Sequence, residues 1–198
     1  MREKETQMKT TIFAIVAALG LTAGAASADN FDNTGASVTA EFGRYDLTVK
    51  GTAADGFTEL SFGANIIDGL DMSVTDYHSN DAYGIGLDYT VTTAVNGFTV
   101  WAVAELEYIA PETSLGNGDF FVTPTVGASY PITGVVTAWG EVDYTWNASE
   151  SFAKAGGVAE IGVDFALADN VTFTPSVARS FDSAVNETQA NLNLTFSF

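Results

Sequence analysis

The last nine residues of the chain alternate between apolar and polar side chains. Ala190, Leu192, Leu194, Phe196 and Phe198 occupy every second position, and Asn, Thr and Ser fill the positions between them. Side chains of an extended strand point to opposite faces with a period of two, whereas helical spacing would scatter both sets. The segment therefore predicts a β-strand with one apolar face and one polar face.

The same alternation recurs along most of the chain, interrupted by turn sequences. Tight turns are predicted at 68–69, 96–97, 131–134 and 168–169. Mostly longer connections are predicted at 52–56, 78–81, 109–118, 147–155 and 182–187. Within 38–49 the apolar phase slips by one residue at Gly43-Arg44, which we interpret as a β-bulge inside one strand. This division predicts about ten strands, with eight as the alternative.

The tight and the longer connections alternate along the chain, so they fall on opposite ends of an antiparallel sheet. Short turns on one end and longer loops on the other are typical of outer-membrane barrels, and an even strand count places both termini on the short-turn side. Aromatic residues stand near both ends of the apolar face, as in the interfacial girdles of membrane proteins. The pattern predicts an all-β fold, a closed antiparallel up-and-down transmembrane β-barrel.

The closing strand ends on an aromatic residue at the chain terminus, and in this it resembles small bacterial outer-membrane barrels of the OmpA and OmpX type. The resemblance covers nearly all of the chain after residue 28, but it is one of pattern rather than of motif. It implies a porin-like barrel in the outer membrane of a Gram-negative bacterium, with membrane lipid and the barrel-assembly machinery as partners. It also implies that Phe198, Phe196 and Leu194 form the assembly signal.

The N-terminal segment has the features of a secretory signal peptide. Lys9 supplies a positive charge, residues 11–21 form a short apolar run, and Ala26-Ser27-Ala28 form a small-residue cleavage site. The run is too short for a membrane-spanning helix. We therefore expect a signal peptide at 1–28 and the barrel domain at 29–198, with either Met1 or Met8 as the true start.

The chain is strongly acidic, with a formal net charge of −18, and it contains no cysteine. Such a charge repels nucleic acid, so a nucleic-acid partner is not expected. The absence of cysteine excludes disulfides, thiolate metal sites and a catalytic thiol. No cofactor or metal motif is present, and none is predicted.

Carboxylates gather on the polar face of three predicted strands: Glu105, Glu107, Glu141, Asp143, Glu160 and Asp164. After residue 28 the bases are only Arg44, Lys50, Lys154 and Arg179, too few to neutralise a buried acidic cluster. Either water hydrates these carboxylates in an open lumen, or some bind cations, or some stay protonated. An acidic wall without a specific ligand is the simplest of these interpretations.

The only histidine, His78, is the main enzymatic candidate. Its adjacent Ser79 would point to the opposite face of a strand, so the two cannot act as nucleophile and base. We therefore predict a non-enzymatic barrel, either a narrow cation-preferring channel or a structural and surface protein. The alternatives are an outer-membrane enzyme resembling a lipid A deacylase or an omptin, and a soluble exported β-sandwich binder.

Overall fold

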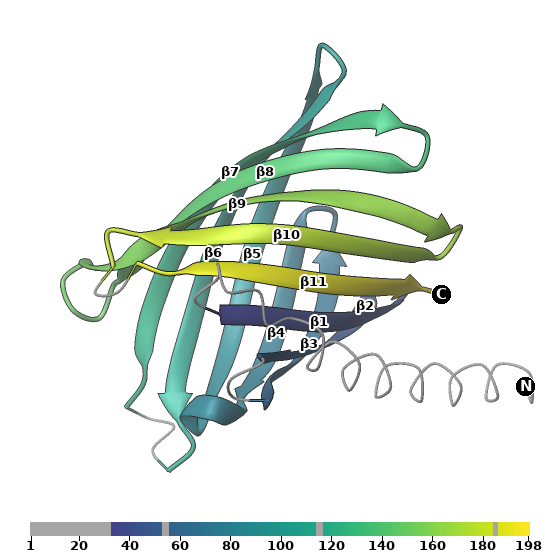
Figure 1. Ribbon diagram of the computed structural model, residues 1–198. Coiled ribbons are helices and arrows are strands. Elements are labelled where there is room, and N and C mark those ends of the chain that lie inside the picture. Colours follow the sequence, from purple (N-terminus) through teal and green to yellow (C-terminus); the bar gives the residue numbers. More distant parts are fainter. Residues whose placement is uncertain (1–32, 53–55, 114–116, 184–185) are drawn as a thin grey trace, which may run out of the picture.

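The computed structural model describes residues 33–52, 56–113, 117–183 and 186–198, and these form one closed β-barrel (Figure 1). The predicted signal peptide lies outside the described residues. The strands are β1 (Asn33–Phe42), β2 (Tyr45–Thr52), β3 (Gly56–Ile67), β4 (Leu70–Tyr77), β5 (Ala82–Val95), β6 (Phe98–Pro111), β7 (Asp119–Thr133), β8 (Val136–Asn147), β9 (Ala153–Ala168), β10 (Val171–Phe181) and β11 (Thr188–Ser197). A short 3-10 helix, η1 (His78–Asn80), follows β4.

Alternation along each strand divides the wall into an apolar outer face and a polar inner face. Large apolar side chains on the outer face are strongly exposed, for example Ile85 (55%), Val126 (60%) and Ile161 (68%). None of the described large side chains is fully buried. Because the sheet closes on itself and leaves no free edge, its backbone groups pair between neighbouring strands. The protein therefore presents its apolar residues outward instead of packing them into a central core.

The connections confirm the predicted difference between the two ends of the barrel. Two-residue turns join the strands at 43–44, 68–69, 96–97, 134–135 and 169–170, and we call this the short-turn end. The opposite end, the loop end, carries the connections at 53–55, 78–81, 112–118, 148–152 and 182–187. Asn96 and Gly97 both have positive φ, which is the backbone conformation that a tight hairpin requires.

The strand count is eleven, so the prediction of ten strands is wrong. The difference lies at Gly43-Arg44, which is a hairpin turn and not a β-bulge. Phe42 pairs with Tyr45 across this turn, and Gly43 has φ +67°. A two-residue hairpin places the residues on either side of it on the same face, so it shifts the apolar phase by one residue, as a bulge does.

The extra strand also changes how the barrel closes. β1 pairs with β11 in parallel, from Asn33↔Gln189 to Glu41↔Ser197, whereas every other pair is antiparallel. The prediction of a wholly antiparallel barrel is therefore wrong at the parallel pair of β1 and β11, which we call the seam. With an odd number of strands, the start of β1 lies at the loop end and the end of β11 at the short-turn end, so the two ends of the sheet are not on one side.

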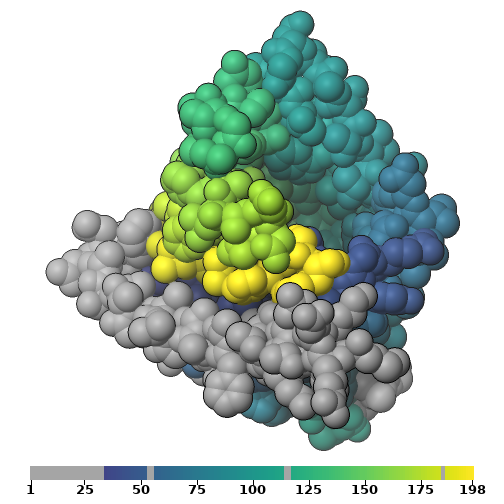
Figure 2. Space-filling view, turned by 90° about the vertical axis from the view of Figure 1, so that its right-hand side faces the viewer, coloured from purple at the N-terminus to yellow at the C-terminus, as the bar shows by residue number. Residues whose placement is uncertain are grey.

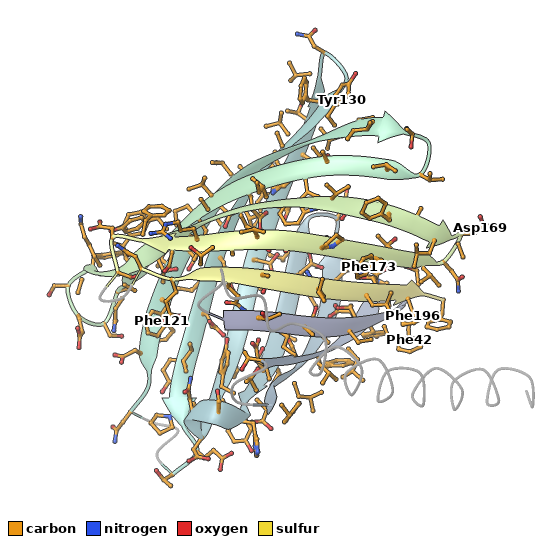
Figure 3. All side chains as sticks on the ribbon, viewed as in Figure 1. Phe42, Phe121, Tyr130, Asp169, Phe173 and Phe196 are labelled. Atoms are coloured by element: carbon orange, nitrogen blue, oxygen red, sulfur yellow. The ribbon has the colours of Figure 1, made fainter. Side chains whose placement is uncertain are left out.

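Aromatic side chains form two bands on the outer face. At the short-turn end Phe42 stacks on Phe198 with ring centroids 5.2 Å apart, and Phe98 lies 4.9 Å from Tyr130. Figure 3 labels four aromatic residues at this end: Phe42, Tyr130, Phe173 and Phe196. At the loop end the centroid distances are 4.8 Å for Tyr108–Phe120 and 4.6 Å for Tyr144–Trp146. The apolar residues described above lie between the two bands.

Within the described part of the chain, no helix is both long enough and apolar enough to cross a membrane.

Candidate functional site: the acidic inner wall

All six carboxylates of the predicted acidic cluster lie on the inner wall. Glu105 and Glu107 belong to β6, Glu141 and Asp143 to β8, and Glu160 and Asp164 to β9. The cluster shares this wall with further inward carboxylates on other strands: Glu41, Asp46, Glu59, Asp71, Asp88 and Asp119. The acidic character therefore extends around the lumen and is not limited to three strands.

The two glutamates of β6 lean over glycines of the neighbouring strand β5. A Cβ added to Gly84 would lie 2.5 Å from Oε1 of Glu107, so the missing side chain leaves the room that this carboxylate occupies. The Tyr77 hydroxyl reaches across β5 from β4 and donates a hydrogen bond to Glu107. Glu105 pairs in register with Asp88, another inward carboxylate, and no base separates the two.

Glu141 and Glu160 are directly opposite each other on β8 and β9. Like charges at paired positions of a sheet repel each other unless other groups compensate. Glu160 accepts hydrogen bonds from the Ser176 hydroxyl and, at 3.1 Å, from the Asn191 amide. On the same wall Asp143 accepts a 3.2 Å hydrogen bond from the backbone N–H of Val158. Neutral donors therefore stabilise this part of the cluster.

Two tryptophans complete the inner wall near the short-turn end. The Trp139 indole N–H donates to Asp164 at 3.1 Å, and Thr174 donates to the same carboxylate oxygen at 2.7 Å. Trp101 donates to Glu141 in the same manner. Our prediction of the site did not include these tryptophans. The sequence did contain a signal for them, because both occupy the same alternate positions as the polar residues of their strands.

Positive charge is scarce on this wall. Among the described strands, Lys50 on β2 is the one base at an inward-facing position. It forms a 2.9 Å ion pair with Glu59 directly opposite on β3. Arg179 and Lys154 pair with the outward positions Ala159 and Trp146. The lumen is therefore rich in carboxylates, and most of them have no cationic neighbour.

The described residues hold no group of three or more His, Asp or Glu side chains that could bind a metal ion. His78 lies exposed on η1, with its ring centroid 5.4 Å from that of Phe57. It stands at the loop end and outside the acidic cluster, so it does not join these carboxylates in a shared site.

The three residues of the predicted assembly signal lie on the outer face at the seam. Leu194 and Phe196 pack against the buried Val38 and Ala40 of β1. Phe198 stacks on Phe42, and its backbone N–H donates to the Glu41 carbonyl at 2.9 Å. These contacts join the C-terminus to the first strand, which is the pairing that closes the barrel.

A separate charged group lies at the loop end. The carboxylate of Asp182, just after β10, accepts hydrogen bonds from the Tyr144 hydroxyl at 2.5 Å and from the Lys154 ammonium at 2.9 Å. The Tyr144 hydrogen bond and then the Lys154 contact lower the pKa of Asp182 below its usual value, because both stabilise the ionised form. The group connects the ends of β8, β9 and β10.

No family model matches the chain, and no curated protein matches its sequence.

Proposed function

We propose that the protein is an outer-membrane β-barrel of a Gram-negative bacterium and acts as a narrow, cation-preferring channel. The membrane location is supported by the apolar outer face, where large apolar side chains such as Ile85, Val126 and Ile161 are exposed. A transmembrane strand needs about 9–11 residues, and the strands range from 8 residues in β2 to 16 in β9. The predicted signal peptide and the short turns at one end agree with this location.

The preference for cations follows from the charge of the inner wall. Carboxylates on β3, β5, β6, β8 and β9 face one lumen, and the inward base Lys50 is already paired with Glu59. Negative charges along a narrow path with low-dielectric walls raise the local concentration of cations. Eleven strands give an interior somewhat wider than the eight-stranded case that side chains can fill. This imbalance of charge is the observation that carries the proposal.

Membrane insertion is tested first, on the full chain refolded into detergent or lipid. A folded outer-membrane barrel is expected to migrate differently on a gel before and after boiling, and to remain with the outer membrane when cell envelopes are fractionated. A chain that stays soluble without detergent and shows no heat-dependent migration contradicts the membrane location.

The channel is tested by planar-bilayer recording under a KCl gradient. We expect a small conductance with a reversal potential on the cation-selective side. We expect the reversal potential to move toward zero when four lumen carboxylates are changed together to their amides: Glu105, Glu107, Glu141 and Asp143. A matched control changes four carboxylates outside the lumen, Asp68, Glu112, Glu150 and Asp169, to amides and is expected to keep most of the selectivity.

The absence of current, or a preference for anions, would overturn the channel proposal. The remaining role would be that of a structural and surface protein, acting through the connections at the loop end. Equal loss of selectivity in the lumen variant and in the control would show that net charge, and not the inner wall, determines the preference.

A further inference from the structure

Two indole rings lie against the inner wall, each in close contact with a glycine of the next strand. A Cβ added to Gly127 would be 2.3 Å from the Trp101 ring, and one added to Gly162 would be 2.5 Å from the Trp139 ring. Both glycines are the direct register partners of these tryptophans. Each indole therefore occupies the space that a side chain at the glycine would take, and both rings line a pocket that opens to the lumen.

The two rings share a cavity with two carboxylates. Trp101, Ser129, Trp139, Glu141 and Asp164 line a space of about 310 Å³ near the short-turn end. Figure 2 views the molecule toward this end, where the surface is hollowed between the teal strands and the green and yellow ones. Each indole N–H donates to one of the carboxylates, so Glu141 and Asp164 lie at the edges of the two rings.

We propose that this cavity binds a small organic cation, a quaternary or primary ammonium compound. The inference rests on the proposed function and assigns a substrate class to the same lumen. Aromatic rings attract cations through the ring quadrupole, and such an attraction is measurable at exposed sites as well as buried ones. The carboxylates of Glu141 and Asp164 add ionic attraction at the ring edges.

The charge of the surroundings favours a cation over a neutral sugar, which could also stack on indole rings. Glu160 lies directly opposite Glu141, and no base lines the cavity. A positive ligand would be attracted by the carboxylates of Glu141 and Asp164, whereas a neutral ligand would not. The pocket is open to the lumen, and its volume is at the lower end of the range of ligand pockets, about 300–1,000 Å³, so it would contact a compact cation on one side.

The binding test uses fluorescence of the refolded full chain with Trp146→Phe as background. Trp146 lies on the outer face beside Tyr144, so this change leaves the two inner tryptophans as the only indoles. Choline chloride is titrated against 3,3-dimethyl-1-butanol, its neutral carbon analogue, and against glucose at constant ionic strength. We expect a saturable fluorescence change with choline and none with the two neutral compounds.

The site is then separated from the general charge of the lumen by two double variants. Glu141→Gln with Asp164→Asn is expected to raise the Kd for choline at least tenfold. Asp71→Asn with Asp88→Asn removes the same charge from inward positions outside the cavity and is expected to change the Kd by less than threefold. Heat-modifiable migration confirms that both variants are folded. Trp139→Phe alone, which keeps both carboxylates, is expected to weaken binding about fivefold.

The outcomes distinguish this inference from the channel. A protein that conducts cations selectively but shows no saturable response to choline overturns the binding site and leaves the channel intact. A saturable response without conductance supports the site and removes the channel. Equal responses to choline and its neutral analogue, a response to glucose alone, or equal loss in the two double variants would each overturn the assignment of an organic cation.

Discussion

The outer and inner faces of the barrel are made by the same strands, yet the outer face is mainly apolar and the inner face mainly polar. Along β6 the outward positions Val100 and Leu106 are apolar, and the alternate positions Thr99, Glu105 and Glu107 carry polar or charged groups. The outer face uses large side chains that pack sideways against their neighbours. The inner face combines glycines with long polar side chains that lie across them. Because its side chains alternate, one strand contributes to both an apolar face and a polar face.

The largest expected effect comes from breaking the outer face at the seam. Phe198→Ser removes the ring that stacks on Phe42, and it also polarises the terminal residue that resembles an assembly signal. We expect loss of the protein from the outer membrane and its degradation in the periplasm, measured by fractionation and immunoblot. Phe198→Tyr keeps the ring and serves as the control. Normal outer-membrane levels of Phe198→Ser contradict the prediction.

A pair of adjacent substitutions compares the two faces directly. Val100→Arg places a charge on the outer face two residues from Phe98 of the short-turn aromatic band, and its cost is expected to be below the roughly 2–4 kcal/mol of an arginine at the bilayer midplane of a barrel. Thr99→Arg places the same charge on the inner wall, where carboxylates and water receive it, and we expect a smaller loss. Unfolding in urea from lipid vesicles measures both free energies. Equal losses would mean that the two faces do not differ in environment.

Alanine substitutions of two glycines, one on each face, compare the packing of the inner and outer faces without introducing a charge. Gly127→Ala forces the Trp101 indole off the inner wall, because the new Cβ would lie 2.3 Å from the ring. We expect a loss of about 1–3 kcal/mol, as in other overpacked sites, together with a shift of tryptophan emission. Gly140→Ala on the outer face meets Ile161 at 3.3 Å and is expected to change stability by about 0.5 kcal/mol or less. Reversal of this order contradicts the inner packing described above.

The smallest expected effect lies at the loop end, outside both faces of the wall. Asp182→Asn removes the charge that Tyr144 and Lys154 contact. Because the pKa of folded Asp182 is below its unfolded value of about 3.9, its stabilisation is present above that pH and is lost as pH falls through the folded pKa. We expect a slightly lower Tm for the variant at pH 7, and a difference that shrinks as the pH is lowered below about 3.9. A difference that does not shrink as the pH falls would exclude the ionised carboxylate as its cause.

The sequence alone determined the alternation, the two kinds of connection and the face on which each residue lies. Those features are local, because a period of two and a two-residue turn are encoded by neighbouring residues. The same reasoning placed the six carboxylates on one polar face, and it identified Leu194, Phe196 and Phe198 as one apolar edge. Local pattern was therefore sufficient to predict an all-β barrel and the composition of its two faces.

Only the tertiary structure determined the strand count and the closure. A bulge and a two-residue hairpin at Gly43-Arg44 shift the apolar phase equally, and the 12 residues of 38–49 have the length of one strand, as β3 does. The parallel pairing of β1 with β11 joins residues 156 positions apart, as in the Ser37–Asn193 hydrogen bond, so no local signal specifies it. The same applies to the contacts of Trp101 with Gly127 and of Tyr77 with Glu107. Each depends on the register between strands, which is set when the whole sheet closes.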